Sequence, residues 1–377
     1  MKKIQTLLKF QLPVVFILLL ILPFLNSEVG IWTFERIDEN RRFQDSLSLD
    51  INRLDSFPKE ADAYLNDNFS FRTPLLDLYH RIKFSYFKIS PYPDRSIVGK
   101  DGWFFIAGRE KEIYEGNLNY SQAALNSFLV EWKYRKTYLD SLNIKTYWII
   151  APFKHYVYSE YMPFNIYHSK IRRVDQIKEY FKKELPDLIL DLLPLLKENK
   201  DSCKLYYKLD NHWNSHSAYL VTKGLLEKIR TDFPNDTVPD IPPFVWEEKE
   251  VNSGFHYNVI GIKELSEIKQ TPVMKNLNSI KVEKYGFKFN GEFGYADEYE
   301  IRYLNKKLKS GLKILIIRDS FAGVLIPFIR EEFKESVFIW DKWQYGLNKQ
   351  IIEVVKPDVV VFLGLETHID NLLKDYK

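Results

Sequence analysis

Four short apolar runs rich in β-branched residues, separated by segments with helical spacing, most constrain the fold of this chain. The runs are TYWIIAP at 146–152, KILIIRDS at 313–320, SVFIW at 336–340 and DVVVFLGL at 358–365. Helical patterns lie beside them, as in FAGVLIPFIREEF and QIIEVVKP. Continuously apolar strands joined by helices are typical of a parallel sheet whose two faces are both covered. We therefore expect an α/β domain with a parallel sheet flanked by helices.

Size and charge narrow the class of protein further. The chain has 377 residues, 45% of them hydrophobic and 16% aromatic, which is ample for a large packed core. Its 54 basic and 51 acidic side chains leave a formal charge of only +3, without a dense Lys/Arg tract, so nucleic acid is a poor candidate partner. Cys203 is the single cysteine, which excludes an intramolecular disulfide and a cysteine zinc cluster.

The N-terminal segment combines positive charge with an apolar run. Lys2, Lys3 and Lys9 precede or border the run from Phe10 to Leu25. Counting the leucines just before it, the run reaches the roughly 20 residues needed to cross a bilayer, and the charge ahead of it favours a cytoplasmic start. We predict a single-pass transmembrane anchor over 1–30 in the cytoplasmic membrane, with the rest of the chain on the periplasmic or extracellular side. A cleaved signal peptide is the alternative, although no A-x-A-like pair follows the run.

Three further segments follow the anchor. Residues 31–95 contain LLDLYHRIKFSYF, whose apolar positions have helical spacing, and we expect a helical neck there. The main domain is expected over 96–377, beginning with SIVGKDGWFFI, where an Asp-Gly pair between two β-prone stretches predicts a tight hairpin. Residues 244–303 have weaker helical signals and many Gly, Asn and aromatic residues, which we interpret as a β-rich insertion.

Ser320 follows the apolar run KILII directly, at a predicted change from strand to helix. Ligands of parallel α/β sheets collect at the carboxyl ends of the strands. A serine in such a turn has an exposed hydroxyl, and its backbone N–H lies at a positive helix end that can stabilise an oxyanion. The alternative is structural, because Asp319 or Ser320 can simply cap the following helix.

The stretch YYKLDNHWNSHSAYL, at 206–220, contains a candidate base. In an extended chain Asp210 and His212 point to the same side, because strand side chains alternate with a period of two. A carboxylate bonded to Nδ1 fixes the tautomer of the ring and leaves Nε2 to take a proton from a hydroxyl. Asp210, His212 and Ser320 therefore form a candidate catalytic triad, whose chemistry does not depend on their order in the chain.

Two other interpretations of this stretch remain. Asp210, His212 and His216 are a possible set of metal ligands, but the segment lacks the HExxH glutamate and no cysteine cluster supports it, so no metal site is predicted. Asn214 or Ser215 is a suitable N-cap for a following helix, and this is compatible with the triad because it concerns different residues. His216 and Trp213 then have structural roles, although an aromatic ring beside the site can also stack on a sugar.

Five motifs carry a resemblance to a known family. Along the chain they are SIVGKDGWFF, APFKHYVYSEYMP, KLDNHW, ILIIRDSF and KPDVVV, in the order expected for that family. The similarity covers most of the chain after about residue 60. With them the chain resembles the SGNH-hydrolase-like AlgX/AlgJ and DHHW group, which is similar to O-acetyltransferases of exported polysaccharides such as alginate. The resemblance implies an SGNH-hydrolase-like fold with a permuted triad order, in which Asp210, His212 and Ser320 are catalytic. Ordinary serine blocks of SGNH enzymes begin with Gly, whereas this chain has Arg318 there.

The activity that the resemblance implies is transfer of an acetyl group to a polysaccharide through an acyl-enzyme on Ser320, without a cofactor. With water as the acceptor the same triad would make an esterase, and a silent glycan-binding or assembly component is the non-enzymatic alternative. An integral membrane acyltransferase (MBOAT-like) is the partner expected to supply acetyl groups. Candidate oxyanion or substrate residues are the Ser320 N–H, the strand ends near 341–343 and 364–366, and the following side chains: Trp213, Lys154, Tyr158, Trp343 and Glu366.

Overall fold

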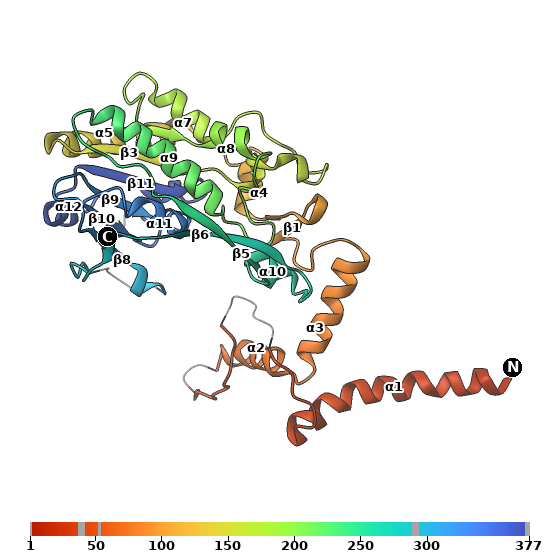
Figure 1. The fold of residues 1–377 in the computed structure, drawn as a ribbon. Helices are drawn as coiled ribbons and strands as arrows, with labels where there is room; N and C mark the ends of the chain where they lie inside the picture. The colour runs from red at the N-terminus through yellow and green to blue at the C-terminus, as the bar shows by residue number, and fades with distance from the viewer. Residues whose placement is uncertain (1, 37–41, 52–53, 289–293, 374–377) are drawn as a thin grey trace. The chain divides into compact units, whose positions relative to one another are not determined.

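The computed structural model describes residues 2–36, 42–51, 54–288 and 294–373, and the chain divides into two compact units (Figure 1). One unit comprises residues 1–96 together with 253–265. The other comprises residues 97–252 together with 266–377 and contains the large sheet. Each unit is therefore made of two separate segments of the chain.

The smaller unit is helical. Its elements are α1 (Lys2–Val29), α2 (Phe57–Asn68), α3 (Arg72–Arg81), the π-helix η2 (Ile82–Tyr86) and α10 (Phe255–Ile260). Arg81 joins two distant parts of this unit, since it donates hydrogen bonds of 2.8 Å both to Asp77 and to Glu264. Gly261 ends α10 with a φ of +69°, and a Cβ there would lie 2.2 Å from Nδ1 of His80. Only glycine fits this position.

The predicted transmembrane helix is wrong for the part of the chain that the structure describes. The segment is helical, as α1, with Pro13 and Pro23 inside it. However, none of the described helices is both long and apolar enough to cross a membrane. The uninterrupted apolar stretch of the sequence runs only from residue 12 to residue 25, between Gln11 and Asn26. This is short of the roughly 20 residues that a bilayer requires.

The larger unit is built on a seven-stranded sheet with the order β4-β3-β11-β9-β10-β8-β7. The strands are β3 (Lys145–Ala151), β4 (Ile189–Asp191), β7 (Ser279–Lys281), β8 (Glu300–Asn305), β9 (Lys313–Arg318), β10 (Glu335–Ile339) and β11 (Val359–Leu365). Four of them, β3, β9, β10 and β11, lie where the apolar runs predict strands. These four are mutually parallel, so their carboxyl ends meet at one edge of the sheet.

The expectation of a simple parallel sheet is wrong, because the sheet is mixed. β8 pairs antiparallel with β10, and β7 pairs antiparallel with β8. A parallel pair needs a crossover of a dozen or more residues, and the link between β8 and β9 spans only residues 306–312. β8 therefore has to run opposite to β9 and its parallel neighbours. The α/β class and the flanking helices are as expected.

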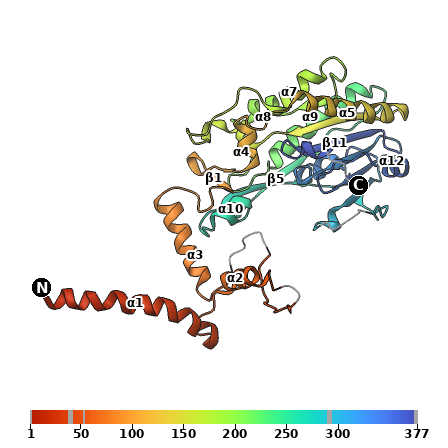
Figure 2. The ribbon, with the colours of Figure 1, turned by 180° about the vertical axis from the view of Figure 1, so that it is seen from behind.

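Helices cover both faces of the sheet. Side chains of α8 (Leu193–Asn199), α9 (Ser215–Asp232) and α11 (Ile326–Ile329) pack with one set of alternate strand residues, such as Ile149 and Leu363. Side chains of α5 (Gln122–Ser141), α7 (Arg173–Phe181) and α12 (Lys349–Val355) pack with the other set, such as Trp148 and Phe362. Figure 1 shows α9 along one face, and the view from behind in Figure 2 shows α5 along the other.

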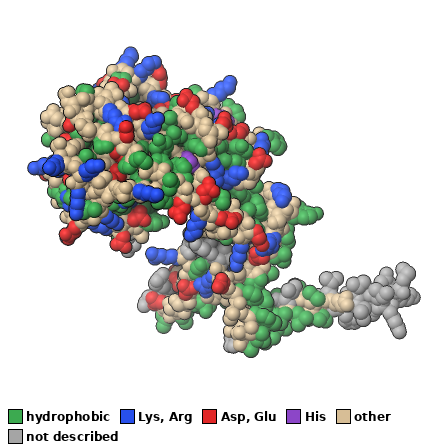
Figure 3. Space-filling model, viewed as in Figure 1, with side chains coloured by type: hydrophobic (Ala, Val, Ile, Leu, Met, Phe, Trp, Pro, Cys, Tyr) green, Lys and Arg blue, Asp and Glu red, His purple; other side chains and the backbone are tan. Residues whose placement is uncertain are grey.

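Two hairpins extend the larger unit. β1 (Ser96–Val98) and β2 (Phe104–Ile106) form the hairpin predicted from the Asp-Gly pair, and both Asp101 and Gly102 have positive φ, at 51° and 75°. β5 (Phe244–Val251) and β6 (Glu267–Met274) pair antiparallel as a separate two-stranded sheet. The remaining helical segments are α4 (Arg109–Tyr114), α6 (Lys154–Val157) and several short turns. On the face drawn in Figure 3, basic and acidic side chains are interspersed, in agreement with the small net charge.

Candidate active site

The turn after β9 presents Ser320 at the carboxyl edge of the sheet. β9 ends at Arg318, Asp319 is the N-cap, and a 3-10 helix, η6 (Ser320–Leu325), begins at the serine. The Asp319 carboxylate accepts a 2.8 Å hydrogen bond from the backbone N–H of Phe321. The helix cap considered as the structural alternative to catalysis is therefore present, and Asp319 makes it. The hydroxyl of Ser320 remains available for another partner.

Asp319 also joins this turn to the neighbouring strand. It is fully buried, and its second carboxylate oxygen accepts from the backbone N–H of Leu365 at 2.7 Å and from the Tyr345 hydroxyl at 2.8 Å. Burial alone would raise the pKa of Asp319, but the nearby His368 and these hydrogen bonds outweigh it and hold the pKa below its usual range. An ionised Asp319 therefore fixes the position of the serine turn against the end of β11.

His212 is placed by a short β-bridge. The bridge pairs Tyr206 with Trp213, and the backbone N–H of Tyr207 donates to the carbonyl of His212 at 3.2 Å. Between the two sides of the bridge the chain bends, so residues 209–212 are not extended as the alternation argument assumed. Because of the bend, one oxygen of Asp210 accepts from the His212 backbone N–H at 2.9 Å and lies 2.5 Å from Nδ1 of its ring. The carboxylate thus holds both the ring and the backbone of the histidine.

The structure brings Asp210, His212 and Ser320 together. Nε2 of His212 lies 2.8 Å from Oγ of Ser320, although the two residues are separated by 108 positions in the chain. Asp210 at Nδ1 makes Nδ1 the protonated nitrogen and leaves Nε2 as the acceptor for the serine hydroxyl. The side chains of His212 and Asp210 are 33% and 21% exposed, so a substrate can reach the pair from solvent. Nucleophile, base and orienting carboxylate are within hydrogen-bond reach of one another.

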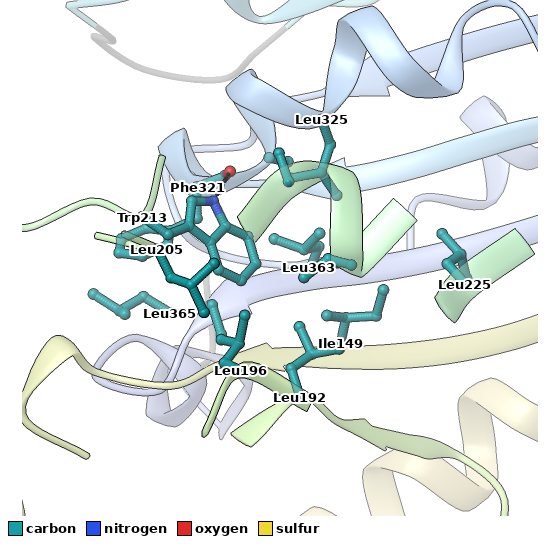
Figure 4. Close-up of a cluster of buried hydrophobic side chains, with 14 of the residues drawn as sticks. Ile149, Leu192, Leu196, Leu205, Trp213, Leu225, Phe321, Leu325, Leu363 and Leu365 are labelled. Carbon is teal, nitrogen blue, oxygen red and sulfur yellow. Dashed lines mark hydrogen bonds between the residues drawn. The ribbon is translucent and has the colours of Figure 1, made fainter. Parts of the chain in front are cut away.

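Trp213 connects the histidine segment to the serine turn within the buried core. Its indole N–H donates a 2.7 Å hydrogen bond to the backbone carbonyl of Phe321, and the side chain is fully buried. The rings of His212 and Phe321 lie 4.8 Å apart, and those of Trp213 and Phe321 lie 5.4 Å apart. Figure 4 shows Trp213 and Phe321 side by side above Leu205 and Leu365 in the core. Trp213 therefore supports the site and has no surface on which a sugar can stack.

Comparison with known proteins supports the resemblance seen in the motifs. Residues 97–272 match a family model described as ALGX: SGNH hydrolase-like domain, acetyltransferase AlgX. Residues 97–272 therefore resemble the SGNH hydrolase-like domain of AlgX. The matched range contains Asp210 and His212, whereas Ser320 lies beyond it. No curated protein sequence matches the chain significantly.

Solved structures of PatB1 and AlgJ, both of low sequence identity, show the same fold. PatB1 of Bacillus cereus is 18% identical, with a TM-score of 0.53, over 73% of this chain and 95% of that chain. The O-acetyltransferase domain of Pseudomonas putida AlgJ is 14% identical, with a TM-score of 0.50, over 75% of this chain and 94% of that chain. A DHHW family protein from Eubacterium siraeum is 14% identical over 73% of this chain and 95% of that chain, with a TM-score of 0.49. These likenesses show a shared fold.

Lys154 holds the segment that carries Asp210 in the AlgX-like domain. Its ammonium group donates hydrogen bonds to three backbone carbonyls, those of Tyr207 at 3.0 Å, Lys208 at 3.3 Å and Asp210 at 2.6 Å. The side chain is only 3% exposed, and burial lowers the pKa of Lys154 to about 7. Its three N–H groups therefore have protein partners, and its role is to position the segment before His212.

Two other side chains support the same segment. Glu267 accepts from the backbone N–H groups of Lys208 at 2.8 Å and Leu209 at 3.1 Å. The Tyr158 hydroxyl accepts from the backbone N–H of Leu205 at 2.9 Å, and its ring stacks on Trp103 with centroids 4.1 Å apart. Tyr158, which the sequence suggested as a substrate contact, is thus buried within the support of the histidine segment. Nothing in the sequence around Glu267 indicated this role, because it depends on a contact between distant segments.

The later strand ends hold the remaining candidates. Glu366 is fully buried, and its backbone N–H donates to Ala151, while the N–H of Leu365 is bonded to Asp319. Burial raises the pKa of the Glu366 carboxyl to about 7, against the nearby Arg172 and Arg173, which lower it. The structure thus gives both backbone N–H groups at this strand end a protein partner, so they are not oxyanion donors.

Trp343 lies in the loop after β10, beside other aromatic rings. It is partly buried, with its ring 5.7 Å from that of His368 and 5.9 Å from that of Trp340. Its backbone carbonyl accepts from the side chain of Asn371 at 2.9 Å. In the same loop the Asp341 carboxylate accepts from the N–H groups of Tyr345 and Gly346 at 3.0 Å and 2.7 Å. Those N–H groups close the loop and are therefore not directed at a substrate.

Arg318 and His216 make their side-chain contacts with residues outside the triad. Arg318 is 1% exposed, its guanidinium lies 4.8 Å over the ring of Trp340, and it donates to the carbonyl of Glu298 at 3.2 Å. His216 lies 2.5 Å from a side-chain oxygen of Gln270 through Nε2, and Asn214 caps the helix in which it lies. In the described part of the chain, no group of three or more His, Cys, Asp or Glu side chains is placed to hold a metal ion.

Proposed function

We propose that this protein is an O-acetyltransferase that modifies a polysaccharide through an acetyl-enzyme on Ser320. The observation that carries the proposal is the 2.8 Å contact between His212 Nε2 and Ser320 Oγ, with Asp210 on the opposite nitrogen of the ring. The match of residues 97–272 to the AlgX acetyltransferase model supports the type of group that is transferred.

In the first half-reaction, Oγ of Ser320 attacks the carbonyl carbon of an acetyl donor. His212 takes the hydroxyl proton on Nε2 as the new C–O bond forms, and Asp210 stabilises the imidazolium that results. When the tetrahedral intermediate collapses, the bond to the leaving group breaks and His212 returns the proton to that group. We assign the backbone N–H of Ser320, at the start of η6, as one donor to the oxyanion. The product is an acetyl ester on Ser320.

In the second half-reaction, a hydroxyl of the acceptor replaces the donor. His212 removes the proton from this hydroxyl, whose oxygen attacks the acetyl carbon, and Ser320 leaves and recovers a proton from His212. If water attacks instead, acetate is released and the same triad acts as an esterase. The partial exposure of His212 and Asp210 is compatible with either acceptor.

The acceptor, the donor and the location are parts of the proposal that rest on the resemblance to the AlgX group. The acceptor is an exported polysaccharide, and alginate is the example that the resemblance to this group gives. The acetyl groups come from an integral membrane acyltransferase of the MBOAT type, and the catalytic domain acts outside the cytoplasm. Cell fractionation with a protease-accessibility assay tests the location, and co-purification with the membrane acyltransferase tests the partner.

The central experiment uses the full chain and p-nitrophenyl acetate. Wild-type protein is expected to release p-nitrophenol and to carry an acetyl group on Ser320 in intact-protein mass spectrometry. Ser320→Ala and His212→Ala are expected to lose on the order of 10³-fold or more of the turnover with an unchanged circular dichroism spectrum. Ser127→Ala, on the exposed side of α5, is the matched serine control.

The products separate the alternatives. Acetylated oligosaccharide formed in competition with acetate identifies a transferase, whereas acetate alone identifies an esterase. Glycan binding of equal strength in wild type and Ser320→Ala, with no acetyl adduct on either protein, would instead identify a glycan-binding component and contradict the enzymatic proposal.

A further inference from the structure

The loop that follows β10 has a backbone that its sequence does not favour. Lys342, Trp343 and Tyr345 have positive φ angles of 56°, 63° and 50°. None of them is glycine, and Gly346, the glycine of this loop, is not among the residues with positive φ. A side chain disfavours the left-handed region because its Cβ comes too close to a backbone carbonyl oxygen. The loop 341–346 is therefore strained, and surrounding contacts have to hold it.

Hydrogen bonds from three parts of the domain hold this loop in its strained form. The Asp341 carboxylate accepts from the backbone N–H of Tyr345 at 3.0 Å and from that of the following glycine at 2.7 Å. Arg135 of α5, which is 3% exposed, donates to the carbonyl of Tyr345 at 2.5 Å. The side chain of Asn371 donates to the carbonyl of Trp343 at 2.9 Å. The packing of the domain thus fixes the path of the loop.

The side chain of Tyr345 reaches the turn that carries the candidate nucleophile. Its ring is 2% exposed and lies against the backbone of Gly364 in β11, where a Cβ would be 2.4 Å from the hydroxyl oxygen. The hydroxyl donates to Oδ2 of Asp319 at 2.8 Å, and Oδ1 of the same carboxylate accepts from the backbone N–H of Phe321 at 2.8 Å. Ser320 stands between Asp319 and Phe321 in the chain. Tyr345 therefore binds the carboxylate that closes the serine turn.

The path of the loop bears on the contact between nucleophile and base. A right-handed backbone at the strained positions would send the loop along another path and carry the Tyr345 hydroxyl away from Asp319. Asp319 is fully buried, so it would lose a hydrogen bond that solvent cannot replace. Ser320 follows it directly, and a rotation of this carboxylate would move Oγ from its position 2.8 Å from Nε2 of His212. A misplacement of about 1 Å can cost about 100-fold in rate.

We propose that Tyr345 is a positioning residue for acyl transfer, and that the strained loop 341–346 holds its hydroxyl on Asp319 so that Ser320 stays aligned with His212. The inference rests on the proposed function of Ser320 as the nucleophile and adds a determinant of its position. Tyr345 acts through Asp319 and not on the substrate. Its loss is therefore expected to lower kcat and to leave KM nearly unchanged.

The first test is Tyr345→Phe, which removes the hydroxyl and keeps the ring. With p-nitrophenyl acetate, kcat is expected to fall at least about tenfold, while KM stays within about twofold of the wild-type value. Tyr147→Phe is the matched control, because Tyr147 is also 2% exposed and its hydroxyl also donates to a carboxylate, that of Asp232 at 2.7 Å. Thermal unfolding is expected to show similar losses of stability in the two variants, whereas only Tyr345→Phe loses kcat.

The second test changes the backbone preference of the loop at Lys342, whose side chain is exposed. Lys342→Gly removes the side chain and suits the left-handed region. Lys342→Val removes the same charge but disfavours that region, because its side chain is β-branched. Lys342→Gly is expected to keep the wild-type kcat, and Lys342→Val to lower it at least about threefold through displacement of Tyr345.

Two results would overturn this inference and leave the proposed function standing. One is a kcat of Tyr345→Phe equal to that of Tyr147→Phe in the presence of an active wild type. The other is an equal kcat in Lys342→Val and Lys342→Gly. Absence of both turnover and an acetyl adduct on Ser320 in the wild-type protein would instead overturn the proposed function, and this inference with it.

Discussion

The indole N–H of Trp213 donates a 2.7 Å hydrogen bond to the backbone carbonyl of Phe321. Trp213 follows the candidate base in the chain, and Phe321 follows the candidate nucleophile. This buried bond therefore joins the two segments that have to meet for His212 to reach Ser320. Its geometry links the packing of the core to the alignment of the triad.

Replacing Trp213 by Phe is expected to impair both stability and turnover. The carbonyl of Phe321 would be buried without its donor, which costs about 1–3 kcal/mol in the free energy of unfolding. Chemical denaturation and ester hydrolysis measure the two effects. Trp132→Phe is the matched control, because the Trp132 indole N–H is buried without a hydrogen-bond partner in the described part of the chain. An equal loss of turnover in both variants would contradict a specific role for the bond.

Replacing Asp210 by Asn is expected to lower kcat by roughly 10³–10⁴-fold, the effect known for such a change in serine proteases. An amide at this position can donate to Nδ1 and so favour the tautomer in which Nε2 carries the proton, which removes the acceptor for Ser320. Steady-state kinetics with p-nitrophenyl acetate measure the loss. Asp232→Asn, where the carboxylate instead accepts from Tyr147, is expected to retain full turnover. Retention of turnover by Asp210→Asn would exclude Asp210 as the orienting group.

The buried Glu366 is expected to make stability depend on pH. Burial raises its pKa from 4.5 to about 7 in the native protein, so between these values the native state holds a proton that the unfolded chain has released. The stabilising contribution is complete below about pH 4.5 and is lost as the pH rises to about 7, with a total of about 3 kcal/mol. Glu366→Gln is expected to flatten this part of the pH profile of the unfolding free energy.

The control for Glu366 is Glu353→Gln, which changes an exposed glutamate on α12. It is expected to leave the pH profile unchanged. A profile for Glu366→Gln that runs parallel to that of wild type between pH 4.5 and 7 would show that Glu366 does not titrate there.

Gly364 is expected to tolerate no side chain. A Cβ at this position would lie 2.4 Å from the hydroxyl oxygen and the adjacent ring carbon of Tyr345, and the Tyr345 hydroxyl donates to Asp319 beside Ser320. Gly364→Ala should therefore displace Tyr345, reduce stability and lower turnover at least about tenfold, measured by thermal unfolding and ester hydrolysis. Gly224→Ala in α9, where the nearest atom is at 3.8 Å, is expected to raise stability by about 0.5–1 kcal/mol. Unchanged turnover in Gly364→Ala would separate Tyr345 from the site.

Much of the fold was predictable because burial leaves a local pattern. The runs that form β3, β9, β10 and β11 are apolar on both faces. The Asp-Gly pair at 101–102 readily adopts the positive φ angles that a tight hairpin turn requires. The antiparallel β8 escaped prediction because its direction depends on the short link to β9 and on its pairing with β10. The apolar N-terminal run predicted a membrane-spanning helix, which the structure does not support for the described residues.

The residues of the candidate site also fall into two groups, those that a local sequence pattern predicts and those whose role depends on tertiary contacts. The order of residue types in KLDNHW and in IIRDSF is enough to nominate Asp210, His212 and Ser320, since a strand end and an Asp-x-His spacing are properties of a few consecutive residues. Lys154, Tyr158 and Trp213 were nominated as substrate contacts, and the structure instead places all three in the buried support of the site. Whether a polar side chain faces a substrate or a backbone carbonyl is not a local property.

The sequence by itself determined where strands form and which residue types are available for acyl transfer, because backbone propensity and hydrophobic periodicity act within a few residues. Only the tertiary structure decided that Nε2 of His212 meets Oγ of Ser320 and that Trp213 and Lys154 serve as supports. Such contacts join segments up to a hundred or more residues apart, and they exist only once the whole core is packed.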